Sequence, residues 1–371
     1  MNMHWLLVFI PIGLTLDSLG YSPMLVFLAS ALAIVPLAKL MGDATEVLAR
    51  TLGATLGGLM NATLGNAPEI IISFFALHKG LVDIVKASIT GSIIGNLLFG
   101  LGLAMFAGGL KQGQRLQKFD PNYARMNGAL LFLSAFGLII PSVFTRSAQA
   151  VGNTERAAEI SLPIAGLLLF IYCASFVFTV QKAAADRKAS QQSPLPGPSE
   201  AVEPSAASAS TPEAGGWSRN RALLILAAVT VGLAVMSEIL TGALEPASKS
   251  LGLTPLFTGV FMLALVGNAA ELFSAVRFAR NDQLDVALGI TVGASIQVAL
   301  VVVPLLVFFG NAIGQGMNLV FSFIELIAII LSVTVTRNLI VDGQSSWLEG
   351  LALMVVYFML AVGFYHVPVA R

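Results

Sequence analysis

The chain has 371 residues, of which 56% are hydrophobic and only 11% are charged, and its formal net charge is zero. These values exclude an ordinary water-soluble domain, which needs a far more polar surface, and they leave no basic surface that would suit a nucleic acid. The single cysteine, Cys173, excludes an internal disulfide and a cluster of thiolate metal ligands. We therefore expect an all-α polytopic protein embedded in a lipid bilayer, without a cofactor.

Apolar runs of about twenty residues, the length that a helix needs to cross the hydrocarbon, recur along the chain. The first run has no basic segment before it and no small-residue cleavage site after it, so it is interpreted as a span rather than a removed signal. The eleven predicted spans are 4–19, 22–41, 45–78, 81–109, 124–142, 159–181, 219–243, 250–279, 284–310, 316–336 and 347–366.

One segment differs from the rest, because its Ser, Pro, Ala and Gln residues cannot form a packed core. We interpret it as a flexible cytoplasmic linker, and it divides the chain. The predicted organisation is an extra N-terminal transmembrane helix at 1–21, a first five-helix repeat at 22–182, the linker at 183–218 and a second five-helix repeat at 219–371.

The two predicted repeats share a motif at a constant offset. Gly65-Asn66-Ala67-Pro68-Glu69 returns as Gly267-Asn268-Ala269-Ala270-Glu271, 202 residues later (268 − 66 and 271 − 69). Because each repeat has an odd number of spans, the second must enter the membrane in the opposite orientation. This is the inverted-repeat plan of secondary transporters, whose site lies at the repeat interface near the midplane. The same offset pairs Gly57 with Gly259, Gly91 with Gly293 and Gly108 with Gly310.

The Lys and Arg residues predict the orientation, because cytoplasmic loops carry an excess of them. With the N-terminus in the cytoplasm, fourteen of them fall on the inside and six on the outside. We therefore expect a cytoplasmic N-terminus and a C-terminus outside. The small size and the Ala-rich linker favour a bacterial inner (plasma) membrane.

Each motif places a glutamate at membrane depth, where a carboxylate is costly and is usually functional. Gly65 and Pro68 favour a helix break between them, and irregular backbone is tolerated at that depth only where it lines protein or a cavity. A break frees backbone carbonyl oxygens beside the carboxylates and amides, and such an all-oxygen site suits Ca²⁺ rather than Zn²⁺ or Cu⁺. The predicted oxygen donors are Glu69, Glu271, Asn66, Asn268 and the backbone around Gly65 and Gly267.

The same two glutamates offer a proton reservoir. Like charges in a low dielectric favour the protonated form, so protons compete with the cation. Binding either Ca²⁺ or protons is the requirement for exchange between them. The alternative interpretation is a pair of structural glutamates that cap helices.

A second polar cluster follows each motif, in Gly91-Ser92-Ile93-Ile94-Gly95-Asn96 and in Gly293-Ala294-Ser295-Ile296-Gln297. The amides of Asn96 and Gln297 lie among apolar residues, where an unpaired amide is costly. We predict that they are ligands or orient the glutamates, with hydrogen bonding between helices as the alternative. We assign Ser92, Ser295 and the third embedded acid, Glu238, to a secondary or proton-relay role; for Glu238, a helix end in contact with water is the alternative.

On these residues the chain resembles the Ca²⁺/H⁺ (cation/proton) exchangers of the Ca²⁺/cation antiporter superfamily. Residues 61–69 resemble the first signature of that family, residues 267–271 and 288–297 resemble the second, and residues 342–350 are similar to the loop before its last helix. The resemblance implies eleven helices, built as an extra first helix and two inverted five-helix repeats. It also implies alternating access by movement of residues 22–41 and 219–243.

The resemblance further implies a central Ca²⁺ site on Glu69 and Glu271, with Asn66, Asn268 and Gln297 nearby. The chain departs from the family at three positions. Leu272 stands where members often carry His, and Ala294 and Gly95 stand where they often carry Ser. These departures remove possible ligands or proton carriers.

Secondary active antiport of Ca²⁺ for H⁺ is therefore the leading hypothesis. A Na⁺/Ca²⁺ exchanger would need more hydroxyl ligands, yet Ala67 and Ala269 stand where Thr or Ser would help. A passive cation channel needs a continuous pore, whereas the antisymmetric halves favour alternating access. An enzyme is not expected, because the sequence has no HExxH motif and no Gly-x-Ser-x-Gly turn. A homo-oligomer is left open.

Overall fold

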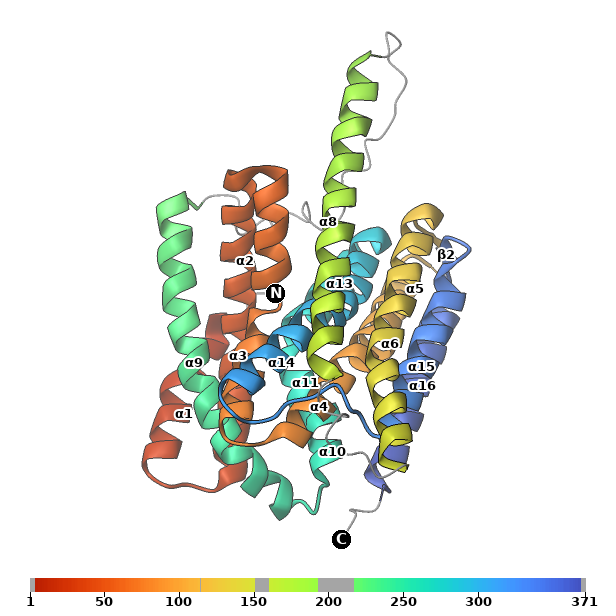
Figure 1. Cartoon of the computed structure of the whole chain (residues 1–371). Helices are drawn as coiled ribbons and strands as arrows, with labels where there is room; N and C mark the ends of the chain where they lie inside the picture. The colour runs from red at the N-terminus through yellow and green to blue at the C-terminus, as the bar shows by residue number, and fades with distance from the viewer. Residues whose placement is uncertain (1–3, 114, 151–159, 193–216, 368–371) are drawn as a thin grey trace.

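The computed structural model describes residues 4–113, 115–150, 160–192 and 217–367. This part of the chain is almost entirely helical, and its helices run alongside one another in a bundle (Figure 1). The two strands assigned in it are short: β1 (Gln117–Lys118) pairs antiparallel with β2 (Gln344–Ser345). The central part of the expected linker, residues 193–216, lies outside the described residues.

The helical elements follow the order of the two predicted halves. Those before the linker are η1 (His4–Val8), α1 (Phe9–Ser18), α2 (Pro23–Leu64), α3 (Ala67–His78), α4 (Val82–Ile94), η2 (Gly95–Gly100), α5 (Leu101–Lys111), α6 (Pro121–Ala150) and α8 (Ser161–Gln192). Those after it are α9 (Arg219–Ser250), α10 (Pro255–Phe257), η3 (Thr258–Leu263), α11 (Ala264–Gly267), α12 (Ala269–Arg280), α13 (Leu284–Gln297), η4 (Val298–Val302), α14 (Val303–Ala312), α15 (Phe323–Ile340) and α16 (Trp347–Tyr365).

Eight helices of the described chain are long and apolar enough to cross a bilayer, or nine if one bent pair counts as a span. The bent pair is Pro255–Gly267 with Ala269–Arg280. Two further apolar helices, His4–Ser18 and Ala67–His78, are shorter. The structure therefore establishes a polytopic helical membrane protein.

Several predicted boundaries were wrong for local reasons. The gap expected between 41 and 45 is absent, because helix α2 continues through these residues; Figure 1 shows α2 turning at one end of the bundle into two limbs. Helix α15 begins at Phe323 rather than 316, because the Ser322 side chain and Glu325 form a capping box. Helix α8 continues to Gln192, past the expected start of the linker at 183, through a run rich in Ala, Lys and Gln that favours helix.

The buried apolar side chains form two main clusters. The larger one lies among the helices from α3 to α8 and from η3 to α16, and includes Leu97, Leu101 and Leu353. The smaller one joins α2 to α9 through residues such as Ile34 and Leu233. The α2–α9 pair, side by side in Figure 1, therefore has an interior of its own.

Contacts between a helix of the first half and a helix of the second half come in equivalent pairs, in which the two halves trade roles. Helix α5 packs against α16, and α14 packs against α8. Likewise α4 contacts α15, and α13 contacts α6. Each helix of one half thus finds a neighbour in the other half, so the halves are interleaved rather than separate.

Glycine allows the closest of these approaches. A Cβ added at Gly91 of α4 would lie 2.6 Å from the Cα atom of Val260, and a Cβ at Gly259 would lie 2.9 Å from the backbone nitrogen of Ser88. Helix α4 and segment η3 are therefore packed backbone to backbone. The same holds for Gly102 of α5, whose added Cβ would lie 2.7 Å from the carbonyl oxygen of Gly350.

Three segments are wound as wider π-helical turns, namely η2, η3 and η4. Such turns are rare and occur mostly near functional sites. Two of them stand at equivalent places in the repeat, since η2 begins at Gly95 and η4 begins directly after Gln297. Asn96 lies within η2, so both amides singled out in the sequence sit at a π turn.

Candidate cation site at the two helix breaks

The first motif breaks its helix as predicted. Helix α2 ends at Leu64 and α3 begins at Ala67, with Asn66 in a non-helical conformation between them (φ −102°, ψ 21°). Pro68 fits in the first turn of α3, where its missing N–H has no partner to lose. Glu69 also lies in that turn, where the positive end of the helix dipole favours a carboxylate.

The second motif breaks in the same way without a proline. Helix α11 ends at Gly267 and α12 begins at Ala269, and the two axes are bent by 59°. Asn268 again takes the intermediate position (φ −88°, ψ 4°), and Glu271 lies in the first turn of α12. The break therefore does not depend on proline.

The two breaks lie against each other. A Cβ added at Gly267 would be 3.4 Å from Cγ of Glu69 and 3.6 Å from its Oε1 atom, so Glu69 rests on the second break. The Glu69 and Glu271 carboxyl groups are close enough to interact electrostatically. Two glutamates that are 202 residues apart in the sequence therefore belong to one cluster.

Amide side chains from the opposite half hold each break. Asn66 Nδ2 donates to Oε1 of Gln297. Asn96 Nδ2 donates to Oδ1 of Asn268 (2.9 Å), whose own Nδ2 donates to Ser92 Oγ (2.9 Å) and to the Ala264 carbonyl oxygen (2.7 Å). Both predicted alternatives for these amides thus have support: they bond between helices and they orient the breaks beside the glutamates.

Several buried oxygens of this cluster have no hydrogen-bond donor among the described residues. They are Oε1 and Oε2 of Glu69, Oε2 of Glu271 and Oδ1 of Asn96. Other buried polar atoms without a partner lie on Thr45, Gln117 and Ser237. Buried acceptors without donors are uncommon in folded proteins, and a group of them in one place is the arrangement that a cation or protons would satisfy.

Two of the predicted residues are not brought to this cluster. Glu238 is exposed on α9, and its backbone carbonyl accepts a hydrogen bond from Lys79 Nζ (2.6 Å), just beyond the end of α3 opposite Glu69. Ser295 directs its hydroxyl to backbone carbonyls, those of Thr291 (3.0 Å) and Ile93 (3.4 Å). Leu272, where the related exchangers often carry His, is buried, and an added Cβ at Gly100 would lie 2.7 Å from its Cδ2.

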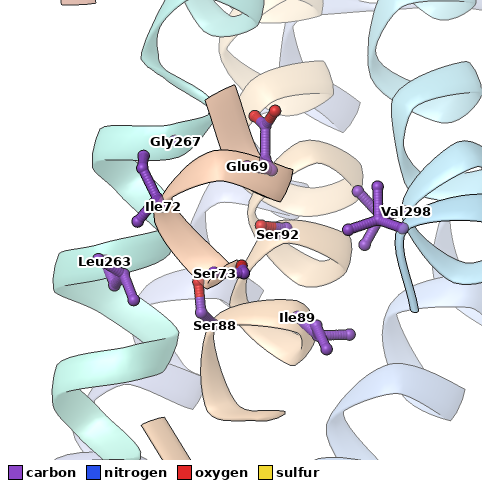
Figure 2. A pocket seen from close by; sticks show the side chains of 10 residues that line it. Glu69, Ile72, Ser73, Ser88, Ile89, Ser92, Leu263, Gly267 and Val298 are labelled. Carbon is purple, nitrogen blue, oxygen red and sulfur yellow. The ribbon is translucent and has the colours of Figure 1, made fainter. Parts of the chain in front are cut away.

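A small pocket opens beside Glu69, with room for about one water molecule. Figure 2 shows Glu69 at one end, Ser92 next to it, and Ser73 and Ser88 further along. Sequence reasoning missed Ser73 and Ser88. Their spacing was the available signal, because Ser73 follows Glu69 by four residues and Ser88 precedes Ser92 by four, which places each pair on one helix face. The rest of the lining is Ile72, Ile89, Leu263, Gly267, Val298 and Val302.

The sequence profile of a family described as "Sodium/calcium exchanger protein" matches the chain twice, over residues 22–181 and 221–366. The chain belongs to this family. The two matches fall on either side of the expected linker and together cover most of the chain.

Members of the family with curated names are similar to this chain over nearly its whole length. A Ca²⁺/H⁺ antiporter of Synechocystis is 40% identical over 365 residues, which is 98% of this chain and 96% of that protein. A Ca²⁺/H⁺ antiporter of Aphanothece halophytica is 40% identical over 373 residues, with the same coverage. The solved structure of native YfkE superposes with a TM-score of 0.81 at 32% identity, covering 99% of this chain and all of YfkE. The family and its membrane-exchanger fold are therefore established for this protein.

Proposed function

We propose that the protein is a secondary active antiporter that exchanges Ca²⁺ for H⁺ by alternating access. The observation that carries the proposal is the group of donor-free buried oxygens on Glu69, Glu271 and Asn96, held at two mutually packed helix breaks. The names of the similar cyanobacterial antiporters support the same pair of substrates. Ca²⁺ is the transported substrate in this proposal, and no cofactor is needed.

The chemistry of the exchange follows from the two carboxylates. Ca²⁺ takes oxygen ligands, and Glu69, Glu271 and Asn96 Oδ1 supply them, together with backbone carbonyls near Gly65 and Gly267. The same carboxylates take up protons when Ca²⁺ leaves, so that the site is filled by one substrate or the other. The amides of Asn66, Asn268 and Gln297 keep the two breaks in register, because each bridges the halves or ties a break to its neighbours.

The architecture in this proposal has eleven membrane crossings, one in residues 1–21 and five in each of two inverted repeats at 22–182 and 219–371. A cytoplasmic connection at 183–218 joins the repeats, and its first residues continue α8 to Gln192. Three observations support it: the separate family matches to the two halves, the reciprocal helix pairs, and the two breaks 202 residues apart. The part that moves against the rest is residues 22–41 of α2 with residues 219–243 of α9, a pair that has its own apolar interior. The excess of Lys and Arg supports a cytoplasmic N-terminus in a bacterial plasma membrane.

Na⁺-coupled Ca²⁺ exchange is the second candidate, since the family description names sodium. It has less support at the site. The motif residues Ala67 and Ala269 carry no hydroxyl, and they flank the breaks where further ligands for Na⁺ would be needed.

The test is Ca²⁺ flux in proteoliposomes with an imposed pH gradient and no sodium. We expect Ca²⁺ uptake that is driven by the gradient and that is lost in Glu69→Gln. Uptake that starts only when an opposing Na⁺ gradient is supplied would move the protein to the Na⁺-coupled branch. Absence of flux under both gradients would mean that another cation is transported.

A further inference from the structure

Three hydroxyl groups line the pocket beside Glu69, and we call Ser73, Ser88 and Ser92 the serine column. Ser73 lies one helical turn after Glu69 on α3, while Ser88 and Ser92 lie one turn apart on α4. All three border the pocket, and Figure 2 shows Ser73 and Ser88 on the far side of Ser92 from Glu69. The column thus leads from the first turn of α3, which carries Glu69, towards the turn that joins α3 to α4; in Figure 2 the Glu69 carboxyl group points to the other side.

Two members of the column lie on nearly buried residues, and their hydroxyls border the pocket. Ser73 is 5% exposed and Ser88 is 7% exposed, and neither has a side-chain hydrogen bond to another described residue, whereas Ser92 Oγ accepts from Asn268. Neither oxygen is among the fully buried unpaired atoms, and water is the usual partner of a hydroxyl that borders a polar pocket. The other side chains of the lining are aliphatic, so the polar groups that water can meet here are Glu69, the column and the backbone at Gly267.

The other half of the chain has no such column. At the offset of 202 residues, Ser73 corresponds to Ala275, Ser88 to Ile290 and Ser92 to Ala294. Ala275 is completely buried and Ala294 is 7% exposed, so apolar groups fill these places. The three hydroxyls of the column therefore have no counterpart at the equivalent positions of the second half.

We propose that Ser73 and Ser88 hold a water molecule that passes protons between Glu69 and the membrane face at which α3 ends and α4 begins. The proposal deepens the antiport function and rests on it. In each transfer a hydroxyl or water gives one proton to its neighbour and receives one from the other side. The Glu69 carboxylate gains or loses the net proton, and the serines are unchanged.

The chemistry of the column fits protons rather than the cation. Ca²⁺ takes about 6–8 oxygen ligands, several of them charged, and a column of neutral hydroxyls between aliphatic walls does not supply them. A proton needs only a chain of groups that both donate and accept hydrogen bonds, which hydroxyl groups and water provide. The serines are positioning residues in this role, since they act through the water that they hold.

The experiment compares two transport modes in proteoliposomes that contain the full chain with Ser73→Ala, Ser88→Ala or both. Ca²⁺/H⁺ exchange requires protons to reach the site, whereas exchange of labelled for unlabelled Ca²⁺ at equal pH does not. We expect the double variant to lose at least about tenfold in Ca²⁺/H⁺ exchange and to keep Ca²⁺/Ca²⁺ exchange unchanged. Ser73→Thr and Ser88→Thr, which retain the hydroxyl, should restore most of the rate.

The matched control is Ser134→Ala on α6, which removes another buried hydroxyl, bonded to the Leu131 carbonyl away from the pocket. Equal losses in both modes would overturn the proposal and make the column part of the cation route or of the scaffold. No loss in either mode would overturn it as well. If the wild type shows no Ca²⁺/H⁺ exchange, the proposed antiport function is wrong instead. If the double variant does not fold, the same comparison of the two transport modes is made with the two single variants.

Discussion

The two halves of the site use the same five-residue plan and differ in what surrounds it. Both motifs end one helix, turn at an asparagine and place a glutamate in the first turn of the next helix. Around Glu69 there are a proline and a pocket with three hydroxyls, whereas Glu271 has an alanine and apolar counterparts. The comparison teaches that the motif specifies the break and the carboxylate, while the neighbouring helices decide how each carboxylate is reached.

The side-chain bonds of the two asparagines reach across the halves. Among the residues whose side chains are described, which leave out 61–63 before the first break, Asn268 bonds to Asn96, Ser92 and the Ala264 carbonyl, and Asn66 bonds to Gln297. Each asparagine is therefore tied to an amide of the opposite half.

The largest effect should come from the residues that the halves share. In the proposed site Glu69→Gln and Glu271→Gln would each remove a charged ligand and a proton carrier, so we expect each to lower Ca²⁺/H⁺ exchange by about 100-fold or more. The measurement is gradient-driven Ca²⁺ uptake in proteoliposomes. Glu349→Gln is the matched control, because Glu349 caps α16 and glutamine serves in a capping box. Normal uptake in either site variant would refute the shared site.

The next largest effect is on stability, and it should differ between Gly91 and Gly293, which occupy equivalent positions in the two halves. A Cβ at Gly91 would overlap Val260 of η3, while a Cβ at Gly293 would meet no atom within 4 Å. We expect Gly91→Ala to destabilise the protein by about 1–3 kcal/mol through overpacking, and Gly293→Ala to be neutral or stabilising by up to about 1 kcal/mol, as alanine favours helix. Thermal unfolding in detergent measures both. Equal shifts would show that the α4–η3 contact is looser than described.

A smaller effect compares two of the side-chain bonds that hold the breaks. Gln297→Ala removes the side-chain partner of Asn66, and we expect Ca²⁺ affinity to fall about 10- to 100-fold, as for other groups that orient ligands. Ser92→Ala leaves Asn268 with two partners, so its loss should stay below about tenfold. Calorimetric titration of the detergent-solubilised protein with Ca²⁺ at constant pH gives both values. The reverse order would show that the Gln297 bridge matters less to Ca²⁺ binding than the Ser92 bond.

The smallest effect concerns the proline that only the first break carries. The second break forms with Ala270 in its place, so Pro68→Ala should keep the break, with Ca²⁺ affinity changed by less than about twofold. We expect a loss of stability of about 0.4–1 kcal/mol, because alanine leaves the unfolded chain more freedom. Titration and thermal unfolding check the two parts. A large loss of affinity would show that the first break depends on its proline after all.

Much of this candidate site could be predicted from the sequence, because a motif that occurs twice lets an inference about one copy be transferred to the other. Gly65 and Pro68 indicated the first break, and the repeat transferred that inference to Gly267, where no proline marks it. The repeat also brought Glu69 and Glu271 to one place. The apolar amino-acid composition predicted a helical membrane protein, because apolar runs of spanning length have few other interpretations.

Other features depend on contacts that no repeat encodes. The offset pairs Gln297 with Gly95, yet the amide that matches it in function is Asn96, because each reaches the opposite break from a π turn. Ser73 and Ser88 resemble many serines that bond to their own helix, and only the pocket distinguishes them. The start of α15 was missed because the capping pair Ser322 and Glu325 outweighs the apolar residues before it.

The π turn of η2 also changes which way its helix faces. In an ideal α-helix successive residues are rotated by about 100°, which would put Gly102 and Gly109 within roughly 40–60° of Ser88, on the side that serves the pocket. A π turn holds about one extra residue, so the residues that follow it are rotated backwards about the helix axis by roughly 100°. Gly102 and Gly109 accordingly face α16, where an added Cβ would strike Gly350 or Trp347. A single surplus residue thus lets one membrane helix present hydroxyls to the pocket in its first half and a smooth glycine surface to α16 in its second.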